Sequence, residues 1–292
     1  MSSPPSSVPP PSFGTAPELP AGVERPARAG EPGWRPWTAW VGLVAAFGAA
    51  LVAALVIGVG GAIAGSSFSD PTPAVNIVAT MAQDVCLVAA ALLFAGLAGR
   101  PRPVDFGLRP THPWRALGWM VLAFAAFFVF TAVWVKIVGG DPSDEKLPEE
   151  LGADDSTVAL LAVAFLVAVV APVAEEFFFR GFFYGALRNW RGVVPAALLT
   201  GLVFGAIHAG STDVEFLVPL AFFGFALCLL RERTGSLYPC IVLHCANNSL
   251  AFGISQEWTW QIPVLFGVSL TIISLGALLV RARWEPAVAA AA

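Results

Sequence analysis

The stretch TVALLAVAFLVAVVAPVAEEFFFR, residues 157–180, decides the fold of this chain. No charged residue interrupts it between Thr157 and Ala174. An apolar helix needs about 20 residues to cross the hydrocarbon core of a membrane. The run is continuous and does not alternate with polar residues, which favours a helix over a barrel strand. We therefore expect a transmembrane helix that ends in charged residues.

The rest of the chain has the same apolar character. Of its 292 residues, 57% are hydrophobic and only 12% are charged, and the mean hydropathy is +0.74. Soluble domains carry about 25% charged residues, and so few charges cannot cover a surface that faces water. The net charge of -4 provides no basic surface for nucleic acid. These values predict an integral membrane protein surrounded by lipid, and they exclude a nucleic-acid partner.

Successive apolar runs define the predicted architecture. We predict an all-α membrane protein, a polytopic bundle of about eight transmembrane helices with an intramembrane polar cavity. The expected spans lie near residues 38–64, 75–98, 115–138, 157–179, 193–210, 214–230, 237–254 and 261–280. The predicted parts of the chain are a disordered Pro/Ser-rich cytoplasmic tail (1–36), a transmembrane domain (37–283, with its motifs at about 157–254) and a short C-terminal tail (284–292).

The arginines predict the orientation of the chain. Cytoplasmic loops of membrane proteins carry an excess of Lys and Arg. If both termini are cytoplasmic, all arginines fall on that side, and only Lys136 and Lys146 fall on the other. The acidic loop 139–156 then lies outside. We expect a multi-pass protein of the cell membrane with both termini in the cytoplasm.

Two adjacent carboxylates near the end of the fourth run are the first candidate site. Glu176 and Arg180 are four residues apart, so they share a helix face and can pair. Glu175 is rotated about 100° from Glu176 and lacks that partner. We therefore predict an ion pair between Glu176 and Arg180 and leave Glu175 available for chemistry. The alternative is an ordinary cluster of interfacial charges that ends a span.

Two histidines in other spans complete the candidate site. His208 follows Phe204 by four residues in the fifth span, and His244 precedes Asn248 by four in the seventh. A carboxylate can take a proton from water, and His and Asn can donate hydrogen bonds to a developing oxyanion. Packing contacts and hydrogen bonds between helices are the alternative roles. Glu175, His208 and His244 could instead hold a zinc ion, although the chain has no helical HExxH pair.

Together these motifs resemble those of the CPBP family, the CAAX-prenyl-protease and bacteriocin-processing (Abi) intramembrane proteases. The family pattern EExxxR, FxxxH and HxxxN on three helices is matched in order by Glu175-Glu176-x-x-x-Arg180, Phe204-x-x-x-His208 and His244-x-x-x-Asn248. The resemblance implies an intramembrane endopeptidase, commonly labelled a metalloprotease. Glu175 would activate water with help from His208, and His244 and Asn248 would bind the oxyanion. Glu176, Arg180 and Phe204 would support this site.

Three functions compete at this stage. The first is an intramembrane endopeptidase acting on a membrane-associated protein or peptide. High Ala, Gly and Arg usage with two lysines suggests a high-GC bacterial gene, which makes a prenylated substrate the less favoured one. The second is a non-catalytic family member that acts as a membrane binding, immunity or scaffold protein. The third is a proton-coupled transporter, suggested by Asp84 beside Gln83 in the second span.

Overall fold

The computed structural model describes residues 32–139 and 147–289, and within them it contains helices and no strands. The predicted all-α class is thereby confirmed. The predicted disorder of the N-terminal tail concerns mainly residues 1–31, which lie outside the described residues. Most predicted spans correspond to one helix each: α1 (Pro36–Ile63), α2 (Pro73–Gly96), α3 (Pro113–Val138), α8 (Val193–Ala206), α9 (Leu217–Thr234), α10 (Tyr238–Ser255) and α11 (Gln261–Ala289).

The fourth span is longer than predicted. It continues from Thr157 to Arg191 as one helical segment of 35 residues. Its successive parts are α5 (Thr157–Phe165), η2 (Leu166–Val170), α6 (Ala171–Glu176), η3 (Phe177–Phe183) and α7 (Tyr184–Arg191), of which η2 and η3 are π-helical. A short helix, α4 (Leu147–Glu150), precedes it, and 3₁₀ turns occupy η1 (Pro103–Phe106) and η4 (Val214–Phe216).

Six helical segments in the described residues are long and apolar enough to cross a membrane, which confirms a multi-pass membrane protein. They include α1, α2, α3, the 157–191 segment, η4 with α9, and α11. The predicted number of about eight includes two further helices. α8 is apolar but has 14 residues, a rise of only about 21 Å. α10 has 18 residues and carries the polar side chains of the third motif.

The helix ends follow from local chemistry. Proline stands in the first turn of α1, α2 and α3, where its missing N–H has no helical partner to lose. Gly192 separates α7 from α8 at φ 80°, a conformation that other residues avoid. The C-terminal helix α11 extends to Ala289, well beyond the predicted end of the last span at 280.

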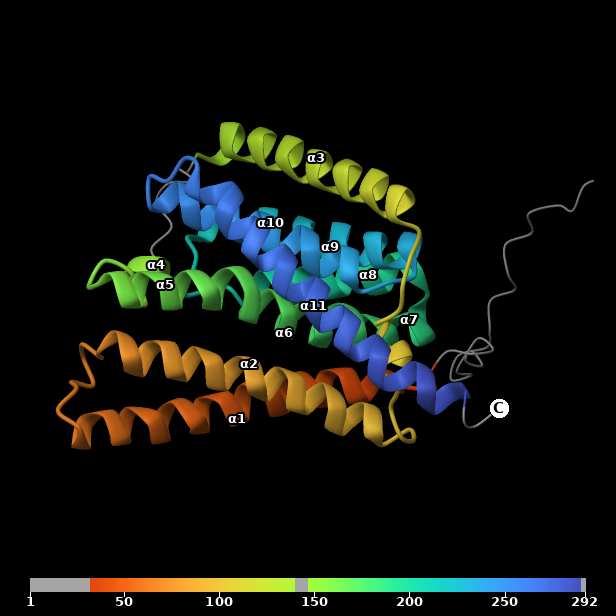
Figure 1. Ribbon diagram of the computed structural model, residues 1–292, viewed down its shortest axis with the longest axis horizontal. Coiled ribbons are helices and arrows are strands. Elements are labelled where there is room, and N and C mark those ends of the chain that lie inside the picture. Colours follow the sequence, from red (N-terminus) through yellow and green to blue (C-terminus); the bar gives the residue numbers. More distant parts are fainter. Residues whose placement is uncertain (1–31, 140–146, 290–292) are drawn as a thin grey trace, which may run out of the picture.

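Figure 1 shows the α1–α2 hairpin at one edge of the bundle and α3 at the opposite edge. Between them lie the 157–191 segment and α8 to α10, while α11 crosses obliquely in front. The outer helices expose large apolar side chains such as Val44, Leu51 and Val129, as expected for helices that face lipid. Many of the fully buried large side chains belong to the central segment, including Phe178, Phe179, Phe182 and Phe183, each 0% exposed.

Two glycines bring α8 and α9 into close contact. A Cβ atom on Gly201 would lie 2.5 Å from the Ala221 carbonyl oxygen, and one on Gly205 would lie 2.5 Å from the Leu217 carbonyl oxygen. This small-xxx-small spacing lets two helix backbones approach where larger side chains would hold them apart. The second motif, Phe204 to His208, is therefore held by direct backbone packing.

A Gly205→Ala substitution is expected to lower the free energy of unfolding by about 1–3 kcal/mol, the usual cost of overpacking. The added methyl would meet the backbone of α9, which cannot turn aside as a side chain can. Thermal unfolding in detergent would measure the loss. Gly118→Ala, where an added Cβ meets no atom within 4 Å, is the matched control. Equal stabilities of the two variants would contradict this packing.

Candidate active site

The two glutamates of the first motif lie near the middle of the 157–191 segment and not at its end. The helix continues past Arg180 because η3 and α7 extend it to Arg191. Glu176 and Arg180 are both 0% exposed. The alternative of an interfacial cluster that ends a span is therefore wrong for these two residues.

Glu176 accepts two charge-assisted contacts through one oxygen. Its Oε1 lies 2.7 Å from Arg180 Nη1, which forms the ion pair predicted from the spacing. The same Oε1 lies 2.9 Å from His244 Nδ1 on α10. Arg180 also donates from Nη2 to the Gly224 carbonyl of α9 at 3.1 Å. One buried ion pair thus joins three helices of the bundle.

Glu175 faces the other side of the same imidazole. Its Oε2 lies 3.8 Å from His244 Nε2, and this oxygen is buried without a hydrogen-bond partner among the described residues. The side chain is 14% exposed, in contrast to the fully buried Glu176. With Nδ1–H donated to Glu176, the Nε2 atom of His244 is directed toward Glu175. A carboxylate that orients a histidine in this way fixes its tautomer and its ring position.

Aromatic rings enclose this polar cluster. The Arg180 guanidinium lies 4.2 Å from the centroid of the Phe204 ring, a cation–π distance. The Phe204 and Phe223 rings lie 5.7 and 5.6 Å from the His244 ring. Phe223 carried no signal in the sequence, because one phenylalanine among 22 is not distinctive. The rings exclude water and strengthen the electrostatic contacts inside them.

His208 lies just beyond the end of α8, in a turn, although the sequence placed it inside a span. Its Nδ1 atom lies 2.7 Å from the Phe204 carbonyl oxygen, so Nδ1–H can donate and leave Nε2 as an acceptor. The Phe204 ring contacts both the His208 ring, at 4.9 Å, and the His244 ring. In the described residues no hydrogen bond or ion pair joins His208 to the two glutamates.

Asn248 is held by the irregular part of the central helix. Its Nδ2 donates to the Val167 carbonyl at 3.0 Å. In η2 the Ala171 N–H bonds to the Leu166 carbonyl five residues earlier. The next bond of that π pattern would join residue 172 to Val167, but Pro172 has no N–H. Asn248 replaces this missing donor, and its amide group carries a second hydrogen besides the one given to Val167.

Asn248→Ala is expected to destabilise the fold by about 1–3 kcal/mol, because it leaves the buried Val167 carbonyl without a donor. Adding Pro172→Ala restores an N–H at residue 172 and should recover part of the loss. Thermal unfolding of both single variants and the double variant forms the cycle that measures this coupling. Gln256→Ala, which removes an amide side chain from the C-cap of the same helix, is the control. Additive effects would show that Pro172 and Asn248 act independently.

The alternative zinc set does not assemble. A catalytic zinc ion needs three protein ligands arranged around one point. No group of three or more His, Cys, Asp or Glu side chains in the described residues is placed to hold a metal ion. Glu175 and His244 approach each other, whereas His208 contacts the Phe204 ring and has no hydrogen bond or ion pair with either of them in the described residues. The three residues therefore do not fit a metal centre in this arrangement.

Asp84 lies closer to the site than the sequence suggested. It is 3% exposed on α2, and α2 packs against α6, the part of the central helix that carries the two glutamates. The sequence marked Asp84 as a charge inside a span, but only the packing of α2 on α6 relates it to the first motif.

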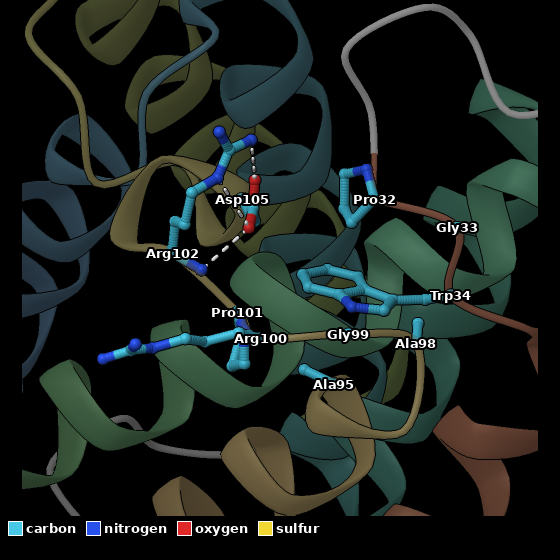
Figure 2. Close-up of a pocket in the computed structure, with 10 residues that line it drawn as sticks. All are labelled: Pro32, Gly33, Trp34, Ala95, Ala98, Gly99, Arg100, Pro101, Arg102 and Asp105. Carbon is cyan, nitrogen blue, oxygen red and sulfur yellow. Dashed lines mark hydrogen bonds and ion pairs between the residues drawn. The ribbon is translucent and has the colours of Figure 1, made fainter. Parts of the chain in front are cut away.

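A pocket of about 300 Å³ lies elsewhere, where the start of α1 meets the end of α2 (Figure 2). Trp34, Gly99 and Arg100 are among its lining residues, and none of the three motifs contributes to it. Arg102 and Asp105 pair across its edge at 3.1 Å. The polar residues of the motifs are instead packed against one another and against aromatic rings.

Comparison with known proteins identifies the central segment. Residues 157–250 match the family model "Type II CAAX prenyl endopeptidase Rce1-like". This match contains α5 to α9 and most of α10, and therefore all three motifs. No solved structure gives a significant match.

Three curated bacterial proteins are similar to parts of the chain. "Putative membrane peptidase YdiL" of Bacillus subtilis is 29% identical over 31% of this chain and 36% of its own length. An "Uncharacterized 24.3 kDa protein" of Escherichia coli is 28% identical over 45% and 61%. "Uncharacterized protein YyaK" of B. subtilis is 31% identical over 38% and 40%. The chain thus spans between about a third and three fifths of the length of these relatives. The resemblance inferred from the motifs is confirmed, and residues 157–250 are the segment in which this chain is similar to the Rce1-like type II CAAX prenyl endopeptidases.

Proposed function

We propose that this protein is an intramembrane endopeptidase that hydrolyses a peptide bond of a membrane-associated protein or peptide. The observation that carries the proposal is the buried set Glu175, His244, Glu176 and Arg180, in which one imidazole contacts both glutamates. Buried charge in a membrane segment is costly and usually functional. The match of this segment to an endopeptidase family and a relative named as a membrane peptidase support the same activity.

In the proposed reaction Glu175 takes a proton from a water molecule, which then attacks the carbonyl carbon of the scissile bond. Glu175 suits this role because its carboxylate has no strong partner of its own, whereas Glu176 is neutralised by Arg180. The proton passes from Glu175 to the leaving amine as the bond breaks. His208, with Nε2 as acceptor, assists in positioning the water.

The oxyanion would be bound by Asn248 and by His244, which must carry a proton on Nε2 for this role in addition to the Nδ1–H that it donates to Glu176. Glu176 orients the His244 ring, and Val167 anchors the Asn248 amide, so neither donor needs to reorganise during the reaction. Phe204 and Arg180 hold these groups from the outside of the cluster. All these roles are performed by side chains of this protein, with no step assigned to a metal.

The proposal also includes placement in the cell membrane with both termini in the cytoplasm. The distribution of arginines supports this orientation. The substrate would reach Glu175 from within the lipid layer, since the glutamates lie halfway along a helix long enough to span it.

The decisive experiment compares the peptide ends present in membranes of cells that make the wild-type protein or Glu175→Ala at equal levels. New ends that are absent from the Glu175→Ala membranes would establish proteolysis and identify a substrate. Glu149→Ala, an exposed glutamate of α4, is the control and should give the wild-type profile. If wild-type protein and Glu175→Ala give identical profiles in cells that show a phenotype of the protein, a binding, immunity or scaffold role replaces the enzyme.

A further inference from the structure

The pocket between the start of α1 and the end of α2 has no role in the proposed peptidase reaction. Its walls include residues 32–34, which precede α1, and residues 98–102, which follow α2. Both helices are long and apolar enough to cross a membrane. The pocket therefore lies where these two helices leave the hydrocarbon core, at the level of the lipid head groups.

Tryptophan side chains mark the same level. Trp37 and Trp40, at the start of α1, are 47% and 38% exposed, and tryptophan is enriched where lipid meets water. Trp34, which lines the pocket, is only 4% exposed. Its ring lies 5.2 Å from the Phe106 ring and 5.3 Å from the Phe182 ring. The core of the bundle thus holds one aromatic wall of the pocket in place.

The carboxylate at the pocket is already neutralised. Asp105 Oδ1 lies 3.1 Å from Arg102 Nη2, and Asp105 Oδ2 accepts the Arg102 backbone N–H at 2.8 Å. The Asp105 side chain is 11% exposed, whereas the Arg102 side chain is 63% exposed. A guanidinium has five N–H donors. Arg102 therefore covers the carboxylate and still presents donors to a further anion.

Arg100 supplies a positive charge without a partner. Its side chain takes part in no hydrogen bond or ion pair within residues 32–139 and 147–289, and it extends from the turn after α2, apart from the Arg102–Asp105 pair (Figure 2). Arg35, the residue after Trp34, is also exposed. The charges at this pocket are therefore unbalanced and favour an anion.

The size and the walls of the pocket indicate the kind of anion. A volume of about 300 Å³ is at the lower end of the range for small-molecule sites. Pro32, Ala95 and Ala98 line it beside the two arginines, so it offers both carbon and charge. Arginine forms paired hydrogen bonds with phosphate oxygens. These features fit a small phosphate ester that also carries apolar groups.

We propose that this pocket binds the anionic head group of a membrane phospholipid. Arg100 and Arg102 bind the phosphate, and Trp34 contacts the glycerol carbons beside it. A lipid is the occupant because the pocket opens at the membrane surface, where anionic head groups attract basic residues. This site is separate from the three motifs and does not depend on the proposed peptidase function.

Native mass spectrometry of the purified full-length protein, titrated with phosphatidylglycerol or phosphatidylcholine, tests the site. Wild-type protein should bind the anionic lipid more tightly at its strongest site. Arg100→Gln should weaken this binding by about tenfold or more, since it removes a hydrogen-bonding charge. Ala98→Trp should also weaken it, because the larger side chain fills the pocket without changing its charge. Arg115→Gln is the matched control: this exposed arginine begins α3, outside the pocket, and should leave binding unchanged.

Equal affinities of wild-type protein for the two lipids would overturn the proposal. So would equal losses in Arg100→Gln and Arg115→Gln, because binding would then follow the general surface charge. Glycerol phosphate, which lacks acyl chains, should displace phosphatidylglycerol only at far higher concentration. Displacement at equal concentration would show that the pocket takes a soluble phosphate ester and not a lipid. Glu175→Gln should bind phosphatidylglycerol like wild type, so failure of this site and failure of the peptidase function can be told apart.

Discussion

Glu175→Gln is expected to lower the rate of peptide cleavage by about 10²–10⁴-fold, the contribution usual for a general base. The substitution keeps the shape of the side chain and removes only its ability to take a proton. The unfolding temperature should change little, because the Glu175 Oε2 atom makes no hydrogen bond among the described residues. Cleavage of a substrate found by the peptide-end comparison, followed in detergent or vesicles, would measure the rate.

Glu176→Gln provides the contrast that makes this result specific. It should lower the stability as well as the rate, because Arg180 and His244 both contact Glu176 Oε1. Glu149→Gln should change neither quantity. Cleavage by Glu175→Gln at the wild-type rate would exclude Glu175 as the base. Equal loss of stability in the two adjacent variants would mean that both glutamates are structural.

Arg180→Ala is expected to destabilise the protein by about 3–5 kcal/mol, since it leaves the Glu176 carboxylate buried and uncompensated. Arg180 is 0% exposed, donates to Glu176 and Gly224, and stacks on Phe204. Arg180→Lys should recover little of this loss, because an ammonium group cannot reproduce the planar, two-sided contact. Thermal unfolding in detergent, monitored by circular dichroism, would measure the change.

The paired substitution Glu176→Leu with Arg180→Leu separates charge from packing. Replacing a buried ion pair by apolar side chains often restores the stability that either single change removes. We therefore expect the double variant to be more stable than Arg180→Ala but still inactive, because His244 has lost the carboxylate that orients it. A double variant no more stable than Arg180→Ala would show that the ion pair itself is required for folding.

The sequence was sufficient for the fold class and for the local part of the site. Continuous apolar runs specify membrane helices because the backbone must satisfy its own hydrogen bonds in lipid. The pairing of Glu176 with Arg180 was predictable because residues four apart on a helix are neighbours. The three motifs also sufficed to indicate the similarity of residues 157–250 to the Rce1-like endopeptidases.

Other features depended on contacts between distant segments. The helix of the first motif was predicted to end near residue 179, yet it continues to Arg191 because the charges of Glu176 and Arg180 neutralise each other inside the bundle. The sequence likewise did not show that α8 ends before His208. Nor did it show that, in the described residues, His208 does not come together with Glu175 and His244 as a set of metal ligands.

The sequence by itself determined that this chain forms a bundle of membrane helices and carries acidic, histidine and amide groups inside it. Hydrophobicity and helical periodicity are local properties, so they can be read along the chain. Only the tertiary structure decided that His244 contacts both glutamates, that Asn248 replaces the donor missing at Pro172, and that the helix of the buried Asp84 packs against the helix of the glutamates. These relations depend on how helices far apart in the sequence pack, and the close approach of their side chains is set by packing and by the cost of leaving buried polar groups unpaired.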